Sequence, residues 1–178
     1  LGFPARYSLS PALHNAAYAA MGLDICYVVF PVARAIATAV EAVRAMDLLG
    51  VPVTIPHKEA VADLVDRLSP EAERLGAVNC VLVDGGELVG HNTDGAGFVA
   101  ALRSESGFDP VGRRAVVVGA GGAAKAIIAA LGDAGSSDVA VINRSSERAS
   151  AAAALASNGR VGSVEDIATR LSGETERA

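Results

Sequence analysis

The sequence has no tryptophan, only two cysteines and few aromatic residues, and these shortages exclude several classes of protein. Two cysteines, Cys26 and Cys80, cannot form a disulfide framework, and Cys or Cys/His pairs at metal-ligand spacing are absent. We expect both to be buried, reduced thiols of a cytosolic protein. No metal site is predicted, because the three histidines are dispersed along the chain: His14, His57 and His91. They are interpreted as structural residues or as residues that support the side chains of a site.

Long apolar runs and basic tracts are missing as well. No stretch approaches the ~20 apolar residues of a membrane span, and no secretory signal peptide stands at the start. The formal net charge is −5, and no basic patch with interleaved aromatic residues suggests nucleic acid. Of the 178 residues, 51% are hydrophobic, which is enough for a sizeable core. We therefore expect a cytoplasmic globular protein without nucleic-acid or membrane partners.

The first hundred residues are predicted to form a domain of mixed strands and helices. Leu1 and Gly2 are interpreted as the end of a strand whose beginning is missing. Apolar periodicity and helix-start signals predict helices at 10–21, 33–46, 57–68, 70–76 and 93–103. Strands are predicted at 25–30, 51–55, 78–83 and 87–89, the last two joined as a hairpin.

A change of composition follows, and residues 104–112 are predicted to be a linker. Beyond them, strands at 115–118, 138–142 and 160–162 alternate with helices at 121–131, 146–156 and 164–171, after which a polar tail is expected. This alternation is typical of βαβ units with a parallel sheet. The predicted fold class is α/β. An N-terminal substrate domain (1–103) precedes a Rossmann-type dinucleotide domain (113–178) that looks incomplete.

A glycine-rich turn joins the 115–118 strand to the helix that follows it. Glycines allow the backbone to approach a pyrophosphate, and the helix N-terminus offers free N–H groups. The turn could also be purely structural, but the strand before it and the helix after it favour cofactor binding. The candidate cofactor-binding residues are Gly119, Ala120, Gly121, Gly122 and Ala123.

The end of the 138–142 strand predicts which cofactor is bound. An NAD-binding protein usually has an Asp or Glu there for the ribose 2′-hydroxyl. This sequence has Asn143 and Arg144 instead, with Arg148 four residues further on. A guanidinium suits a 2′-phosphate, so NADP is the predicted cofactor. The alternative is that both arginines are solvated charges at a helix start.

Four polar clusters lie at predicted element ends in the first hundred residues: 8–15, 53–58, 76–79 and 90–95. Each has an ordinary interpretation as a cap, a turn or a solvated charge. Polar groups at strand ends converge on a cleft, however, and here they precede a dinucleotide fingerprint.

These clusters contain SxSPxxHN, VTIPHK, GAVN and GHNTDG, and GAGGAAKA and NRS follow them. With these motifs, residues 2 to about 165 resemble the shikimate dehydrogenase family. The resemblance implies reversible NADPH-dependent reduction of 3-dehydroshikimate to shikimate, a step of chorismate and aromatic amino acid biosynthesis. It implies Lys58 and Asp94 as the catalytic pair, in a cleft between the two domains. The implied substrate-binding residues are Ser8, Ser10, Thr54, Lys58, Asn79 and Asp94.

The sequence departs from the family pattern at Pro52, where Ser or Asn is commoner, and at Cys80, where Thr is commoner. The family's last strand, its NATP-like loop and its returning helices are not visible, so we expect that the sequence is part of a longer chain. Three alternatives stay open: a quinate dehydrogenase, an aminoshikimate dehydrogenase, or a non-catalytic NADP-binding regulatory relative. A monomer and a homodimer are both compatible with the sequence, and either Lys58 or Asp94 could transfer the proton.

Overall fold

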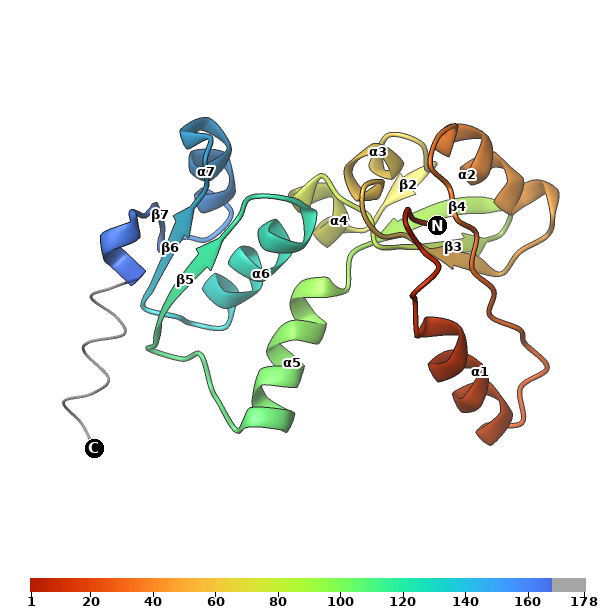
Figure 1. Ribbon diagram of the computed structural model, residues 1–178, viewed down its shortest axis with the longest axis horizontal. Helices are drawn as coiled ribbons and strands as arrows, with labels where there is room; N and C mark the ends of the chain where they lie inside the picture. Colours follow the sequence, from red (N-terminus) through yellow and green to blue (C-terminus); the bar gives the residue numbers. More distant parts are fainter. Residues whose placement is uncertain (168–178) are drawn as a thin grey trace. The chain divides into compact units, whose positions relative to one another are not determined.

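The computed structural model describes residues 1–167, and they form two compact units (Figure 1). Unit 1 comprises residues 1–73 and 77–91, and unit 2 comprises residues 74–76 and the chain from Asn92 onward. The division lies earlier than the linker predicted at 104–112, because helix α5 (Asp94–Ser106) packs against helix α6 (Gly122–Asp133) within unit 2. Residues 164–167 are helical. The end of the helix predicted at 164–171 and the polar tail lie outside the described residues.

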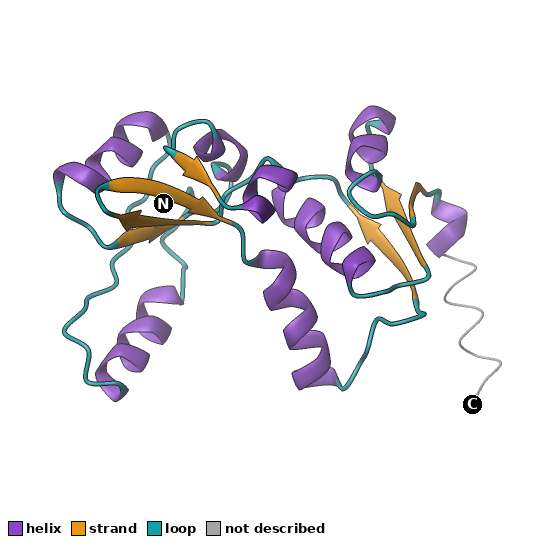
Figure 2. Ribbon diagram, turned by 180° about the vertical axis from the view of Figure 1, so that it is seen from behind, coloured by secondary structure: helices purple, strands orange, loops and turns teal. Residues whose placement is uncertain are grey.

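Unit 1 is built on a four-stranded sheet (Figure 2). Its strands follow the order β1-β3-β4-β2. Its strands are β1 (Gly50–Pro52), β2 (Arg67–Leu68), β3 (Cys80–Asp84) and β4 (Glu87–His91). β3 pairs antiparallel with both β1 and β4, whereas β2 runs parallel to β4. The predicted hairpin is confirmed, because Gly85 and Gly86 form its two-residue turn with φ of 60° and 88°. Glycine adopts such positive φ angles without strain.

Four helices accompany this sheet: α1 (Ser10–Ala20), α2 (Ile36–Ala45), α3 (Lys58–Ala62) and α4 (Pro70–Leu75). The core of unit 1 forms between the sheet and helices α2, α3 and α4. Val40 and Val43 of α2 and Val61 of α3 pack with Val81 and Leu88 of the sheet, and all five side chains are buried. The burial of these apolar faces is the main source of stability for such short elements.

The strand predicted at residues 25–30 is wrong. Residues 25–30 form no strand, and the isolated bridge between Gly2 and Pro31 follows directly after them. A run of β-branched residues forms a strand only where another strand lies alongside it. Here the pairing with the start of the chain is limited to the single bridge between Gly2 and Pro31. The burial expected for Cys26 is also wrong, because its side chain is exposed. Cys80 is half-buried, and burial raises the pKa of its thiol.

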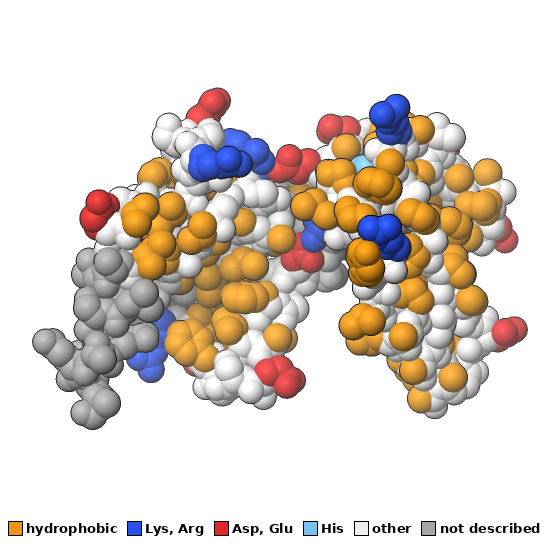
Figure 3. All heavy atoms as spheres, in the orientation of Figure 1, with side chains coloured by type: hydrophobic (Ala, Val, Ile, Leu, Met, Phe, Trp, Pro, Cys, Tyr) orange, Lys and Arg blue, Asp and Glu red, His pale blue; other side chains and the backbone are white. Residues whose placement is uncertain are grey.

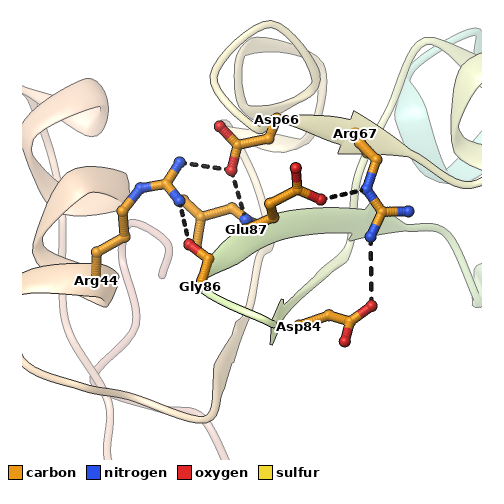
Figure 4. Close-up of polar contacts among 7 residues, drawn as sticks. Arg44, Asp66, Arg67, Asp84, Gly86 and Glu87 are labelled. Atoms are coloured by element: carbon orange, nitrogen blue, oxygen red, sulfur yellow. Dashed lines mark hydrogen bonds and ion pairs between the residues drawn. The ribbon is translucent and has the colours of Figure 1, made fainter.

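The helix predicted at 57–68 ends at Ala62, and Arg67 and Leu68 form strand β2 instead. Tertiary contacts explain the difference (Figure 4). The Asp66 carboxylate accepts hydrogen bonds from the Leu88 N–H and from the Arg44 guanidinium, both at 2.6 Å. The Arg67 guanidinium pairs with Glu87 at 2.6 Å and with Asp84 at 3.3 Å. These contacts fix residues 66–68 beside β4 and outweigh their local helix propensity.

Unit 2 contains a three-stranded parallel sheet in the order β5-β6-β7. The strands are β5 (Arg114–Val118), β6 (Asp138–Ile142) and β7 (Gly159–Val161), and helices α6 and α7 (Ser146–Ala153) connect them. Ile128 of α6 and Ala149 of α7 pack with Val139 and Val141 of β6, and all four are fully buried. Parallel strands with helical crossovers confirm the predicted α/β class.

Within residues 1–167, no helix has both the length and the apolar character needed to span a bilayer.

Candidate active site

The VTIPHK motif places Lys58 beside Asn79 in unit 1. Lys58 is the first residue of α3, directly after the segment that continues β1. The N–H of Val53 donates to the Asn79 carbonyl at 2.8 Å, and the N–H of Val78 donates to the Lys58 carbonyl at 2.7 Å. Two candidate site residues, Lys58 and Asn79, therefore stand on hydrogen-bonded neighbouring segments. Both are half-buried.

The three candidate hydroxyl residues line one pocket of unit 1, with a volume of about 790 Å³. Ser8 and Thr54 are exposed and Ser10 is half-buried. The N–H of Ser10 donates to Ser8 Oγ at 3.3 Å. Hydroxyl groups can donate to a carboxylate without bringing a charge of their own. The structure thus brings Ser8, Ser10 and Thr54 to one pocket, whereas Lys58 and Asn79 are not among its lining residues.

Helix α1, which begins at Ser10, carries no buried side chain. Hydrophobic side chains gather on its surface (Figure 3), and Leu9 beside its N-terminus and Leu13 within it are 80% and 65% exposed. Asn15 connects α1 to the segment after it, because its side-chain amide exchanges hydrogen bonds of 2.7 and 3.0 Å with the Tyr27 backbone. The His14 ring stacks on the Tyr27 ring at 4.7 Å. The sequence alone assigns Asn15 no role.

Asp94 belongs to unit 2, where it is the first residue of α5. Its N–H donates to Oδ1 of the buried Asn92 at 3.1 Å. The next residue, Gly95, lies so close to α6 that a Cβ would stand 2.6 Å from the Ala126 carbonyl oxygen and 2.9 Å from the Ala130 Cβ. Asn92 and Gly95 therefore fix the backbone around Asp94 within unit 2.

The glycine turn between β5 and α6 has open space around it. Gly119 has a φ of 121°, which a side chain would strain. Gly121 is the N-cap of α6, no side chain caps the helix there, and a Cβ at Gly121 would meet no atom within 4 Å. Ala120 is buried, Gly122 is half-buried, and Ala123 is exposed. An uncapped helix N-terminus beside glycines fits a pyrophosphate.

Two arginines lie just beyond the end of β6, as the sequence predicts. Arg144 and Arg148 are both exposed. Arg144 lies in the turn between β6 and α7, where the Asn143 side chain donates to the Ser145 carbonyl at 3.1 Å, and Arg148 lies in the first turn of α7. The Ser145 hydroxyl in turn accepts from the Arg148 N–H at 3.2 Å and so caps α7. Within residues 1–167, no cluster of His, Cys, Asp and Glu could hold a metal ion.

Two family models match this chain. The shikimate dehydrogenase substrate binding domain matches residues 1–81, and shikimate / quinate 5-dehydrogenase matches residues 103–174. This chain belongs to the shikimate dehydrogenase family. The matched ranges include Lys58 and the glycine turn, and Asp94 lies between them.

Several relatives within the shikimate dehydrogenase family are closely similar. The shikimate dehydrogenase (NADP(+)) of Citrifermentans bemidjiense is 53% identical over 146 residues, which cover 82% of this chain and 50% of the relative. The crystal structure of shikimate 5-dehydrogenase from Thermus thermophilus, in complex with NADP(H) and shikimate, is 42% identical with a TM-score of 0.79. The match covers 86% of this chain and 58% of that one.

The solved structures also include an enzyme with a different named substrate. Ligand-free 5-ketofructose reductase of Gluconobacter sp. strain CHM43 is 41% identical, with a TM-score of 0.76, and the match covers 86% of this chain and 55% of that chain. The present chain spans about half the length of the curated relatives it matches.

Proposed function

We propose that the protein is an NADP-dependent dehydrogenase that interconverts 3-dehydroshikimate and shikimate. The observation that carries the proposal is the hydrogen-bonded placement of Lys58 beside Asn79 in unit 1, in a chain whose unit 2 has a dinucleotide-type glycine turn. The names of the C. bemidjiense and T. thermophilus relatives support both the substrate and the cofactor.

The residues of unit 2 fit NADP. The turn from Gly119 to Ala123 would take the pyrophosphate, because its glycines and the uncapped start of α6 leave room for an anion. Arg144 and Arg148, together with Asn143, would bind the adenosine 2′-phosphate through charge-assisted hydrogen bonds. When bound, the nicotinamide supplies or accepts the hydride.

In the reduction, the carbonyl oxygen of the substrate gains negative charge and needs a proton. The Lys58 ammonium would stabilise that charge and donate the proton, and Asp94 would orient the lysine and the same oxygen. In the oxidation, the pair would remove the proton from the hydroxyl. Ser8, Ser10 and Thr54 would donate to the substrate carboxylate, and the Asn79 amide would bridge two ring hydroxyls.

A spectrophotometric assay on the full-length protein tests this function. Shikimate and quinate are each offered with NADP and with NAD, and 5-ketofructose is offered with NADPH. We expect the highest kcat/KM for shikimate with NADP. A clear preference for quinate or 5-ketofructose would replace the proposed substrate. NADP binding without turnover of any of the three would make the protein a non-catalytic relative.

We also propose a cytoplasmic location for the enzyme. The support is chemical, because Cys26 and Cys80 are both unpaired in the structure, as expected in a reducing compartment. A monomer and a homodimer are both compatible with the sequence, and light scattering on the full-length protein distinguishes them.

A further inference from the structure

His57 stands immediately before Lys58, and its side chain is only 6% exposed. Its Nε2 lies 2.6 Å from the carbonyl oxygen of Val32. A carbonyl oxygen only accepts hydrogen bonds, so Nε2 carries a proton and donates it to Val32. Buried polar groups are costly without such a partner. The contact therefore ties the start of α3 to a segment 25 residues earlier in the chain.

This hydrogen bond closes a ring of three backbone segments in unit 1. The N–H of Val32 donates to the Gly2 carbonyl at 3.0 Å, which joins residues 31–32 to the start of the chain. The start of the chain is joined to the VTIPHK segment by two hydrogen bonds. The Thr54 N–H donates to the Leu1 carbonyl at 2.9 Å, and the Phe3 N–H donates to the Ile55 carbonyl at 3.0 Å. His57 connects the VTIPHK segment back to Val32. Each segment of the ring is therefore held by both of the others.

The backbone of Lys58 is fixed on both sides by these contacts. On one side is the anchored His57, whose carbonyl also accepts the α3 hydrogen bond from the Val61 N–H at 3.0 Å. On the other side, the Lys58 carbonyl accepts from the Val78 N–H at 2.7 Å. Helix α3 spans only Lys58–Ala62, so it has little helical structure of its own to hold its first residue.

We propose that His57 is a positioning residue, which holds the Lys58 backbone in its reactive place through the hydrogen bond to Val32. This inference rests on the proposed dehydrogenase function, in which Lys58 is the proton donor. Loss of the bond would leave Lys58 charged and present but displaced. Misplacement of a catalytic group by about 1 Å costs on the order of 100-fold in rate.

The test compares two substitutions in the full-length enzyme. His57→Leu removes the donor, whereas His57→Gln offers a side-chain N–H that can reach the same carbonyl. For His57→Leu we expect kcat to fall by roughly 10- to 100-fold, with KM for NADP unchanged because the candidate cofactor residues lie in unit 2. His57→Gln should recover most of the lost turnover. Equal losses in the two variants would contradict the role of the hydrogen bond.

Two controls separate positioning from general stability. In a Lys58→Ala background, His57→Leu should lower the residual kcat by less than about 2-fold, because residues that act as a unit are not additive. A full further loss would show that His57 does not act through Lys58. Asp66→Ala breaks the Arg44 and Leu88 contacts elsewhere in unit 1 and should lower the melting temperature while leaving kcat unchanged. A comparable loss of kcat in Asp66→Ala would make the His57 effect a stability effect.

A second readout does not depend on activity. The 178 residues contain two lysines, Lys58 and Lys125, and Lys125 lies in unit 2. Acetylation by acetic anhydride, mapped by mass spectrometry, therefore reports on Lys58 with Lys125 as internal reference. We expect the labelling rate of Lys58 to rise several-fold in His57→Leu and to return towards the parent value in His57→Gln. Unchanged labelling of Lys58 would overturn the proposal, even if the parent protein turned over none of the three substrates and the proposed function failed.

Discussion

Replacement of Gly95 by alanine should destabilise unit 2, although alanine is the better helix former. A Cβ at this position would lie 2.6 Å from the Ala126 carbonyl oxygen and 2.9 Å from the Ala130 Cβ. Carbon and oxygen atoms normally approach to about 3.3 Å, so α5 has to move away from α6 by roughly 0.7 Å. Neither contacting atom belongs to a flexible side chain that could yield. Such overpacking costs about 1–3 kcal/mol, against a gain of about 0.5–1 kcal/mol from helix propensity.

The net effect of Gly95→Ala is a loss of up to about 2.5 kcal/mol, which lowers the melting temperature by up to roughly 10 °C for a chain of this size. Gly97→Ala is the matched control, since it lies in the same turn of α5 and a Cβ there meets nothing within 4 Å. We expect Gly97→Ala to raise the melting temperature by about 1–4 °C. Thermal unfolding followed by circular dichroism measures both variants. Shifts of the same sign would refute the packing argument.

Three further predictions concern individual charged residues. Lys58→Ala should lower kcat by at least about 100-fold with a smaller change in KM. Steady-state kinetics on the folded full-length protein measure both constants. A kcat within a few-fold of the parent value would remove Lys58 from the mechanism. Arg144→Asp should weaken NADP binding by roughly 10- to 150-fold and spare NAD, as measured by cofactor titration; equal use of both cofactors by the parent would contradict this. The hydrogen bonds from the Leu88 N–H and from the Arg44 guanidinium lower the pKa of the Asp66 carboxyl. The ionised Asp66 therefore stabilises the fold above the ordinary carboxyl pKa of about 4, and this stabilisation is lost as the pH falls through the lowered pKa. Asp66→Asn should therefore flatten the fall of the melting temperature between about pH 5 and 2, and an unchanged slope would count against it.

Unit 2 is the more predictable half of the fold because its signals are local. Residues 115–118 and 139–142 are continuous apolar runs, and each is followed by a glycine- or serine-marked helix start. A parallel sheet covered by helices needs such runs, so the βαβ pattern can be read from the sequence alone. The boundary between the units is less predictable, because the contact of Gly95 with α6 depends on the distance between two helices rather than on composition.

The errors in unit 1 have a common physical cause. Residues 25–30 have strand composition, and residues 63–68 continue a helical pattern, but the structure of each segment depends on distant partners. For Arg67 and Asp66, those partners are Glu87 and Leu88 at the start of β4, which lie 20 and 22 residues away. A side-chain hydrogen bond across that separation leaves no periodic trace in the sequence, so propensity alone gives the wrong structure.

Three of the front-half motifs, SxSPxxHN, VTIPHK and GHNTDG, combine residues of two kinds. One kind would meet the substrate, as proposed for Ser8, Lys58 and Asp94. The other kind holds the backbone: the Asn15 side chain exchanges hydrogen bonds with the Tyr27 backbone, and the His57 side chain donates to the Val32 carbonyl. Sequence reasoning can find the first kind from its chemistry, but the partners of the second kind are backbone groups, which every residue possesses. Residues of the second kind can therefore be recognised only once the fold is known. Their substitution should reduce turnover by displacing the reactive residue beside them, and not by weakening the binding of the cofactor.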